Sequence, residues 1–167
     1  NLTGGSISFF TVFAILLGLA PLSAQKESNL RQTAETVFLY QRSSGGWPKG
    51  YDRSEKLSIG QKKRVLGWRQ KKEATIDNGA THTEIRLLAK AYQQFGDERF
   101  EKAALRGIIY LLEAQYENGG WPQTYPDPTV YHQHITFNDG AMIGVLEVLS
   151  SIAQKDRGFS FVSDTTR

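Results

Sequence analysis

The segment QRSSGGWP at residues 41–48 recurs as QYENGGWP at residues 115–122, which is 74 positions further along the chain. A second pair follows in the same order, since TIDNGAT at 75–81 reappears as TFNDGAM at 136–142, which is 61 positions further along. Because the two shifts differ, the first copy carries an insertion, and the basic stretch from Lys56 to Lys72 is the best candidate for it. Such a repeat indicates an architecture of stacked, equivalent units.

Each copy is flanked by segments with the apolar spacing of amphipathic helices. The helix before each first loop is marked by Leu30, Ala34, Val37, Phe38 and Gln41, and in the second copy by Phe100, Ala104, Leu111, Leu112 and Gln115. The helix after each second loop is marked by Ile85, Leu88, Ala89, Tyr92 and Phe95, and in the second copy by Ala141, Val145, Val148, Leu149 and Ile152. Strand-like alternation is nearly absent. The pattern therefore predicts an all-α fold, an incomplete α/α toroid built of repeated helical hairpins.

Two helix ends can be predicted from local motifs. The segment Thr81-His-Thr-Glu84 has the pattern of a capping box and predicts the start of a helix. Gly96 and Asp97 predict the end of that helix and the cap of the next one.

The start of the chain has the composition of a secretory signal peptide. Residues 7–20, ISFFTVFAILLGLA, are apolar and uncharged, and small residues follow up to Ala24. The run is shorter than the roughly 20 apolar residues of a membrane-spanning helix. We expect a signal peptide over residues 1–24, cleaved after Ala24, and the α/α-toroid domain over 25–167. An uncleaved membrane anchor is the alternative. Cleavage predicts a secreted or periplasmic protein without stable membrane association.

Charge and cysteine content restrict the partners. The first charged residue is Lys26, so the net charge of +3 belongs to the part after the signal peptide and favours an anionic partner. There is no cysteine, which excludes disulfides and thiolate-bound metals. Seven basic residues between Lys56 and Lys72 fit a solvated surface insertion or a nucleic-acid patch. Export argues against the second reading, so we expect no nucleic-acid partner.

Acidic and amide side chains recur in the second loop of each copy. Asp77 and Asn78 match Asn138 and Asp139, and each pair precedes an expected helix N-terminus, which favours a charged carboxylate. Because equivalent loops emerge at one end of a toroid, we expect all four side chains to face one cleft. Two carboxylates and two amides make an incomplete oxygen cage for calcium, to be completed by a bound ligand. The alternative is that these residues only cap helices and form turns.

Several neighbours of these loops are candidates for contact with a sugar. Trp47 and Trp121 each follow two glycines, and each side chain either stacks on a sugar ring or plugs the end of its hairpin. Lys49 follows the first Trp-Pro and can meet an acidic sugar. Tyr131 and His134 precede the second acidic loop and can line the cleft.

The remaining histidines do not suggest a transition-metal site. His132 lies beside His134 and is a further candidate for the cleft wall, whereas His82 lies inside the expected capping box and is assigned a structural role. Without cysteine, and with its histidines separated, the chain is not expected to bind zinc.

Four segments together resemble the pectate lyases of polysaccharide lyase family 10: GGWPK (45–49), ATIDNGATHTEIRLLA (74–89), YLLEAQYENGGWPQ (110–123) and HITFNDGAM (134–142). The resemblance spans residues 30–162. It implies an α/α toroid, a full-length monomer, and calcium-dependent cleavage of polygalacturonate. It also implies that Asp77 and Asp139 serve the calcium and substrate site, with Asn78 and Asn138 as matched neighbours.

The chemistry implied by the resemblance needs a base. A cation on the uronate carboxylate would stabilise the charge that develops when the neighbouring carbon loses its proton. A group of high pKa must accept that proton. In the family this group is an arginine well after the second acidic loop. Arg157 and Arg167 are the only arginines beyond Asp139, and both lie too early to match it. We therefore expect an N-terminal part of the catalytic domain without its base.

Two other functions remain open from the sequence. A non-catalytic, carbohydrate-binding α/α module would keep the tryptophans and acidic residues and lack the base. The spacing QxxxGxW in both copies also fits terpene cyclases, which form another α/α toroid. Those enzymes need an acidic proton-donor run, and no DxDD occurs here.

Overall fold

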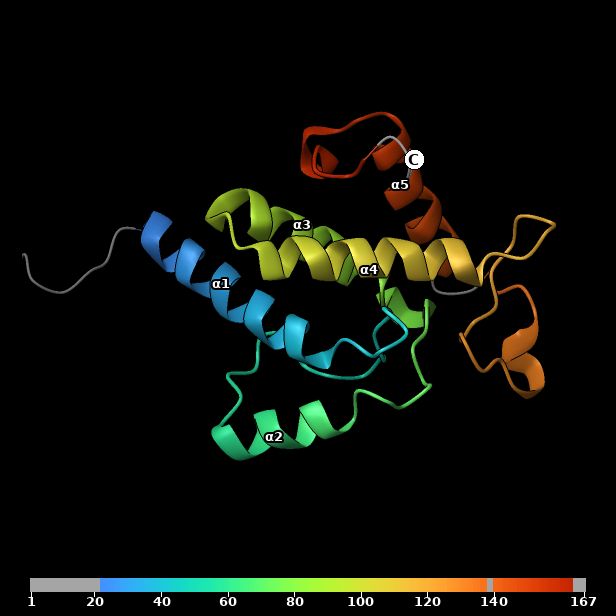
Figure 1. Cartoon of the computed structure of the whole chain (residues 1–167), viewed down its shortest axis with the longest axis horizontal. Coiled ribbons are helices and arrows are strands. Elements are labelled where there is room, and N and C mark those ends of the chain that lie inside the picture. The colour runs from blue at the N-terminus through green and yellow to red at the C-terminus, as the bar shows by residue number, and fades with distance from the viewer. Residues whose placement is uncertain (1–21, 138–139, 164–167) are drawn as a thin grey trace, which may run out of the picture.

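The computed structural model describes residues 22–137 and 140–163, and Figure 1 shows their arrangement. The longer helices are α1 (Leu22–Tyr40), α2 (Ile59–Gly67), α3 (His82–Phe95), α4 (Glu98–Ala114) and α5 (Ala141–Ala153). Short 3-10 turns are η1 (Asp77–Gly79), η2 (Val130–Gln133) and η4 (Arg157–Phe159). Within these ranges the extended segments meet only in isolated bridges, Thr75 with Thr124 and Pro122 with Ile135. The all-α prediction is confirmed.

Helix α3 lies at the centre of the fold and packs against α1, α4 and α5. Its buried face includes Ile85 and Leu88, as the apolar spacing predicts. The close approach of α4 depends on Gly107. A Cβ at that position would lie 2.6 Å from Cγ1 of Ile85 and 2.8 Å from Cζ3 of Trp47. A glycine in the middle of α4 therefore lets two hairpins share one close-packed core.

Trp47 and Trp121, the two tryptophans of the repeated loops, fill that core. The indole of Trp47 is 0% exposed and donates to the carbonyl of Val37 at 2.8 Å. The indole of Trp121 is 1% exposed and donates to the carbonyl of Leu111 at 2.7 Å. A buried ring has no free face on which a sugar can stack. The stacking interpretation of the two tryptophans is therefore wrong, and the plug interpretation is confirmed.

The structure also confirms that the two copies are equivalent. The amide N–H of Thr75 donates to the carbonyl of Trp47 at 2.9 Å, and that of Thr136 donates to the carbonyl of Trp121 at 3.3 Å. These bonds tie the second loop of each copy to its own first loop. The repeat seen in the sequence is therefore a repeat of backbone geometry.

One predicted helix boundary is confirmed and another is wrong. Gly96 adopts a left-handed conformation with φ of 65°, and Asp97 caps α4 by accepting from the N–H of Arg99 at 3.0 Å. The capping box at Thr81 and Glu84 does not form, because Thr81 has φ of 67° and ψ of −59° and makes no capping bond. The hydroxyl of Thr81 binds the backbone of Trp47 and Thr75 instead, and the carboxylate of Glu84 binds Arg53 and Tyr51.

The basic insertion of the first copy folds as a surface element. Its helix α2 has a true capping box, since Ser58 and Gln61 exchange side-chain and backbone hydrogen bonds. Val65 is the buried residue of this helix, and it faces the core, whereas Lys62 and Arg64 are exposed. The interpretation as a solvated surface insertion is confirmed.

Among the helices within the described ranges, none is long and apolar enough to cross a bilayer. The expected signal peptide lies outside the described residues, apart from its last three positions, which begin α1.

Candidate active site

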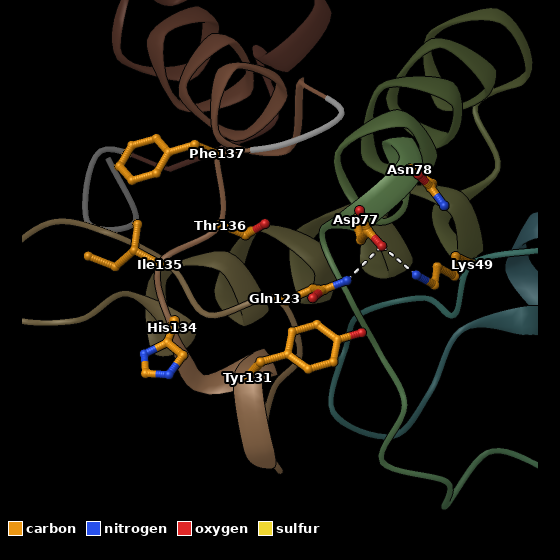
Figure 2. Close-up of a pocket in the computed structure, with 9 residues that line it drawn as sticks. All are labelled: Lys49, Asp77, Asn78, Gln123, Tyr131, His134, Ile135, Thr136 and Phe137. Atoms are coloured by element: carbon orange, nitrogen blue, oxygen red, sulfur yellow. Dashed lines mark hydrogen bonds and ion pairs between the residues drawn. The ribbon is translucent and has the colours of Figure 1, made fainter.

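An open pocket of about 680 Å³ lies where the loops of the two copies meet, and Figure 2 shows its lining. Five residues predicted for the site line it: Lys49, Asp77, Asn78, Tyr131 and His134. Four further lining residues were not predicted: Gln123, Ile135, Thr136 and Phe137. Of the other four predicted site residues, Trp47 and Trp121 are buried in the core, and Asn138 and Asp139 lie outside the described residues.

The pocket has one wall from each copy. The first copy contributes Lys49, Asp77 and Asn78, and the second contributes the segment that follows Gln123. In Figure 2 the hydroxyl of Tyr131 points toward the side on which Lys49 and Asp77 lie. The wall from the second copy is partly apolar and aromatic, so the pocket combines charged groups with aromatic ring faces.

Asp77 is held by two other side chains of the pocket. Its carboxylate is 4% exposed and forms an ion pair with the ammonium of Lys49 through Oδ2. The same oxygen accepts a hydrogen bond from Nε2 of Gln123 at 2.7 Å. Burial alone would raise the pKa of Asp77, but the bonds from Lys49 and Gln123 and the lysine charge lower it below its ordinary value. Asp77 is therefore ionised at neutral pH.

Gln123, one of the four lining residues that were not predicted, contacts Asp77 directly. It follows the second Trp-Pro as Lys49 follows the first, 74 positions earlier. Applying the repeat to Lys49 would have identified Gln123 as its counterpart. Tyr131 and Phe137 are the exposed aromatic rings of the pocket, at 63% and 79%, and they can offer the ring faces that the buried tryptophans cannot.

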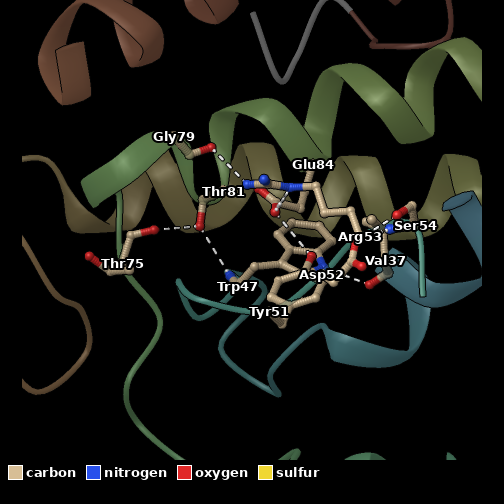
Figure 3. A network of polar contacts seen from close by, with 10 residues as sticks. All are labelled: Val37, Trp47, Tyr51, Asp52, Arg53, Ser54, Thr75, Gly79, Thr81 and Glu84. Carbon is tan, nitrogen blue, oxygen red and sulfur yellow. Dashed lines mark hydrogen bonds and ion pairs between the residues drawn. The ribbon is translucent and has the colours of Figure 1, made fainter. Parts of the chain in front are cut away.

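Thr81 ties together the loops that carry Lys49 and Asp77. Its hydroxyl donates to the carbonyl of Thr75 at 2.7 Å and accepts from the N–H of Trp47 at 3.0 Å (Figure 3). A positive φ is strained for a β-branched residue, and such strain persists only where surrounding bonds impose it. The two bonds of Thr81 do so here, and they set the spacing of the two loops.

A buried carboxylate lies behind the same turn. Glu84 is fully buried, and its Oε1 accepts from Nε of Arg53 at 2.6 Å and from the hydroxyl of Tyr51 at 3.0 Å (Figure 3). Burial raises the pKa of Glu84, although Arg53 opposes that effect. Arg53 also reaches the carbonyl of Gly79 at 3.5 Å. This network holds the end of the turn that presents Asp77.

The histidines occupy three different environments. His134 lines the main pocket, and His132 lines the smaller cavities beside it. His82 is buried, and its ring lies against Gly144 of α5, where an added Cβ would come within 2.2 Å of Cε1. Its structural assignment is confirmed by this packing, although the capping box expected around it does not form.

Arg157 does not lie in the pocket. Its carbonyl accepts a bond from the side chain of Gln93, near the end of α3 remote from Asp77. Gln93 is eleven residues after His82 in this helix, and at 1.5 Å per residue that distance is roughly 16 Å. Among the described residues that line the pocket there is no arginine. This agrees with the expectation that Arg157 is not the base.

The oxygen donors of the pocket suit calcium in kind. Asp77 offers a carboxylate, Asn78 and Gln123 offer amide oxygens, and Thr136 offers a hydroxyl, all of which are hard ligands. Within residues 22–137 and 140–163 no group of three or more histidine or acidic side chains could hold a metal ion. The described residues therefore fit a calcium ion only as part of a shell that a ligand and further protein groups complete.

Comparisons with known proteins agree on one family. The family model of pectic acid lyases matches residues 41–167. A mutant of a family 10 polysaccharide lyase from Cellvibrio cellulosa, solved in complex with trigalacturonic acid, is 33% identical with a TM-score of 0.71. The match covers 87% of this chain and 45% of that one. A second structure of a family 10 polysaccharide lyase from Cellvibrio cellulosa is 34% identical with a TM-score of 0.70. That match covers 89% of this chain and 47% of the lyase. No curated protein sequence matches the chain.

The chain thus spans about half the length of the solved lyases that it matches. Over that half the likeness confirms the α/α-toroid class that the repeats predicted. A family model that covers most of the chain, together with two solved structures above 30% identity, leaves no ambiguity of family. The chain belongs to the pectic acid lyase family and has the fold of the family 10 polysaccharide lyases.

Proposed function

We propose that the pocket around Asp77 binds polygalacturonate and that the whole protein cleaves this polymer by β-elimination with the help of calcium. The observation that carries the proposal is an ionised, buried carboxylate in an open polar pocket beside a lysine. Membership in the pectic acid lyase family and a solved relative in complex with trigalacturonic acid support an acidic polysaccharide as the ligand.

Each described residue has a task in this proposal. Lys49 meets a uronate carboxylate, because its ammonium is already directed into the pocket. Tyr131 and Phe137 offer exposed ring faces to the sugar backbone. Gln123 and Thr81 keep the carboxylate of Asp77 and its loop in place. Asp77, with Asp139 and with oxygens of the polymer, would hold the calcium ion. Calcium, when bound, would neutralise the uronate carboxylate and so make the adjacent carbon more acidic.

β-Elimination removes a proton from the carbon next to the uronate carboxyl group and expels the glycosidic oxygen of the neighbouring carbon. The arginine that the family resemblance implies as proton acceptor would come from outside the described pocket lining, which has no arginine. We further propose that the protein is exported, because its start has a signal-peptide composition and its substrate is extracellular plant polymer.

The test is the ultraviolet absorbance of polygalacturonate treated with the whole protein. Elimination leaves a double bond conjugated to the carboxyl group, whereas hydrolysis does not. We expect a rise in absorbance with calcium, no rise with a chelator, and a loss of the rise in the Asp77→Asn variant. New reducing ends without a rise would contradict elimination. Polymer binding without any cleavage would favour a carbohydrate-binding module instead.

A further inference from the structure

We propose that Lys49 is a built-in counter-ion of Asp77, which an acidic substrate draws away, so that substrate binding opens the Asp77 carboxylate to a divalent cation. This inference rests on the proposed function, because it assigns a role to one residue of that site. It predicts that sugar and cation bind cooperatively through one lysine.

The contacts at Asp77 are the first step of the argument. Oδ2 of Asp77 accepts from both Lys49 and Gln123. Oδ2 of this carboxylate thus already has a positive charge and a neutral donor beside it. A cation that binds here must displace the ammonium or tolerate its repulsion at close range.

The two donors differ in how firmly they are held. Gln123 is buried, its N–H donates to the carbonyl of His132 at 2.9 Å, and its carbonyl accepts from the N–H of Ile76 at 3.1 Å. Lys49 has a side chain that is 46% exposed, and it precedes Gly50, which has φ of 82°. A flexible, half-exposed lysine loses little when it exchanges one carboxylate for another. Lys49 is therefore the partner that moves, and Gln123 is the one that stays.

The charge balance gives the direction of the effect. Without substrate, Lys49 neutralises Asp77 and lowers its attraction for a cation. A uronate in the pocket brings a second carboxylate, which the ammonium of Lys49 can reach. Once Lys49 turns to the sugar, Asp77 regains its full attraction for a divalent cation. By thermodynamic linkage the cation must strengthen sugar binding by the same factor.

Lys49→Gln is the direct test, because it makes the first loop identical to the second, GGWPQ, and keeps a hydrogen-bond donor beside Asp77. Lys62→Gln is the matched control, since it removes the same charge from an exposed position of α2. Isothermal titration calorimetry would measure the binding of calcium alone, of trigalacturonate alone, and of calcium at saturating trigalacturonate.

We expect Lys49→Gln to bind calcium alone more tightly than the wild type, by about fivefold or more, which is the usual scale of such coupling. We expect it to bind trigalacturonate alone more weakly, and the gain in calcium affinity caused by the sugar to shrink. Lys62→Gln should behave as the wild type. Opposite changes in two affinities cannot result from general loosening of the fold.

Two negative results separate the inference from the function on which it rests. If the wild type binds calcium in the presence of the sugar and Lys49→Gln changes neither affinity, the counter-ion role is overturned and the proposed function stands. If no variant binds calcium with or without trigalacturonate, both are overturned.

Discussion

Lys49 and Gln123 occupy the same position in the two copies of one loop, and both donate to Oδ2 of Asp77. Their loops belong to different hairpins, so the carboxylate lies on the seam between the repeats. The repeat therefore does more than enlarge the core, because it places two equivalent residues, Lys49 and Gln123, beside the carboxylate of Asp77.

The hydrogen bond from Gln123 to Asp77 can be tested separately from the ion pair with Lys49. Gln123→Leu removes a buried hydrogen bond to Asp77, and an unmade bond of this kind costs about 1–3 kcal/mol. We expect the affinity for trigalacturonate with calcium, measured by calorimetry, to fall by about tenfold. Gln133→Leu, at an exposed position of η2, is the control. Equal affinities of the two variants would show that Gln123 does not orient Asp77.

The strained threonine offers a second test. Thr81→Val keeps the shape of the side chain but removes the hydroxyl that joins Trp47 to Thr75. We expect a loss of about 1–3 kcal/mol in the free energy of unfolding, measured with urea. Thr81→Ser keeps the hydroxyl and lacks the β-branch, so it should be at least as stable as the wild type. A valine variant of wild-type stability would contradict the role of these bonds.

The close contact of α3 with α4 predicts a steric effect. Gly107→Ala would place a methyl group against Ile85 and Trp47, and overpacking of this kind costs about 1–3 kcal/mol. Gly60→Ala in α2 is the matched control, because nothing lies within 4 Å of its Cβ and alanine favours a helix. Urea denaturation should show the first variant destabilised and the second unchanged or more stable. If Gly60→Ala were destabilised more than Gly107→Ala, the close packing of α4 against Ile85 and Trp47 would be contradicted.

His82 predicts a pH dependence of stability. Burial, together with Arg86 and Arg53, lowers its pKa below 6.5, and Glu147 only partly opposes this. The unfolded chain therefore takes up the proton first as the pH falls. The contribution of His82 is fully present above about pH 6.5 and is lost as the pH falls through the lower pKa of the folded state.

The measurement is the urea midpoint of the wild type and of His82→Leu between pH 4.5 and 7.5, a range of about three units around the ordinary histidine pKa. The slope with pH should flatten in the variant. His134→Gln, which removes an exposed imidazole, is the control. If the urea midpoint depended equally on pH in His82→Leu and in the wild type, His82 would not be the source of the pH dependence.

The plug role of the tryptophans can be separated from sugar binding. Trp121→Phe keeps an aromatic ring and loses the bond to the carbonyl of Leu111. We expect about 1–3 kcal/mol of lost stability, because a buried carbonyl is left without its donor. The affinity of the folded variant for trigalacturonate should stay unchanged in calorimetry. If Trp121→Phe were fully folded but bound trigalacturonate much more weakly, the result would support sugar stacking by Trp121 instead.

Much of the fold could be predicted because it follows from local patterns. The apolar spacing located α1, α3, α4 and α5, and Gly96 with Asp97 located one boundary, since helix ends depend on nearby residues. The capping box at Thr81 failed for a tertiary reason. Trp47 and Thr75 take the hydroxyl, and Arg53 and Tyr51 take the carboxylate of Glu84. Tertiary contacts, three of them with residues more than 30 positions away, thus replaced the local bond.

The sequence identified the charged residues of the site and missed residues whose role depends on their position in the fold. Asp77 and Lys49 carry charges beside a repeated loop, so the sequence alone indicated them. Gln123 is an ordinary amide whose importance comes from its place in the repeat. The exposure of Phe137 and the burial of Trp121 depend on how the second hairpin packs, which no local pattern encodes.

The central claim is that Asp77 organises a site for an acidic polysaccharide. Its most direct test is calorimetric titration of trigalacturonate, in the presence of calcium, into the wild type and into Asp77→Asn, with an uncharged trisaccharide as the control ligand. We predict binding of trigalacturonate by the wild type, a loss of about tenfold or more in the variant, and no binding of the uncharged sugar. Equal affinity of the two proteins for trigalacturonate would contradict the claim.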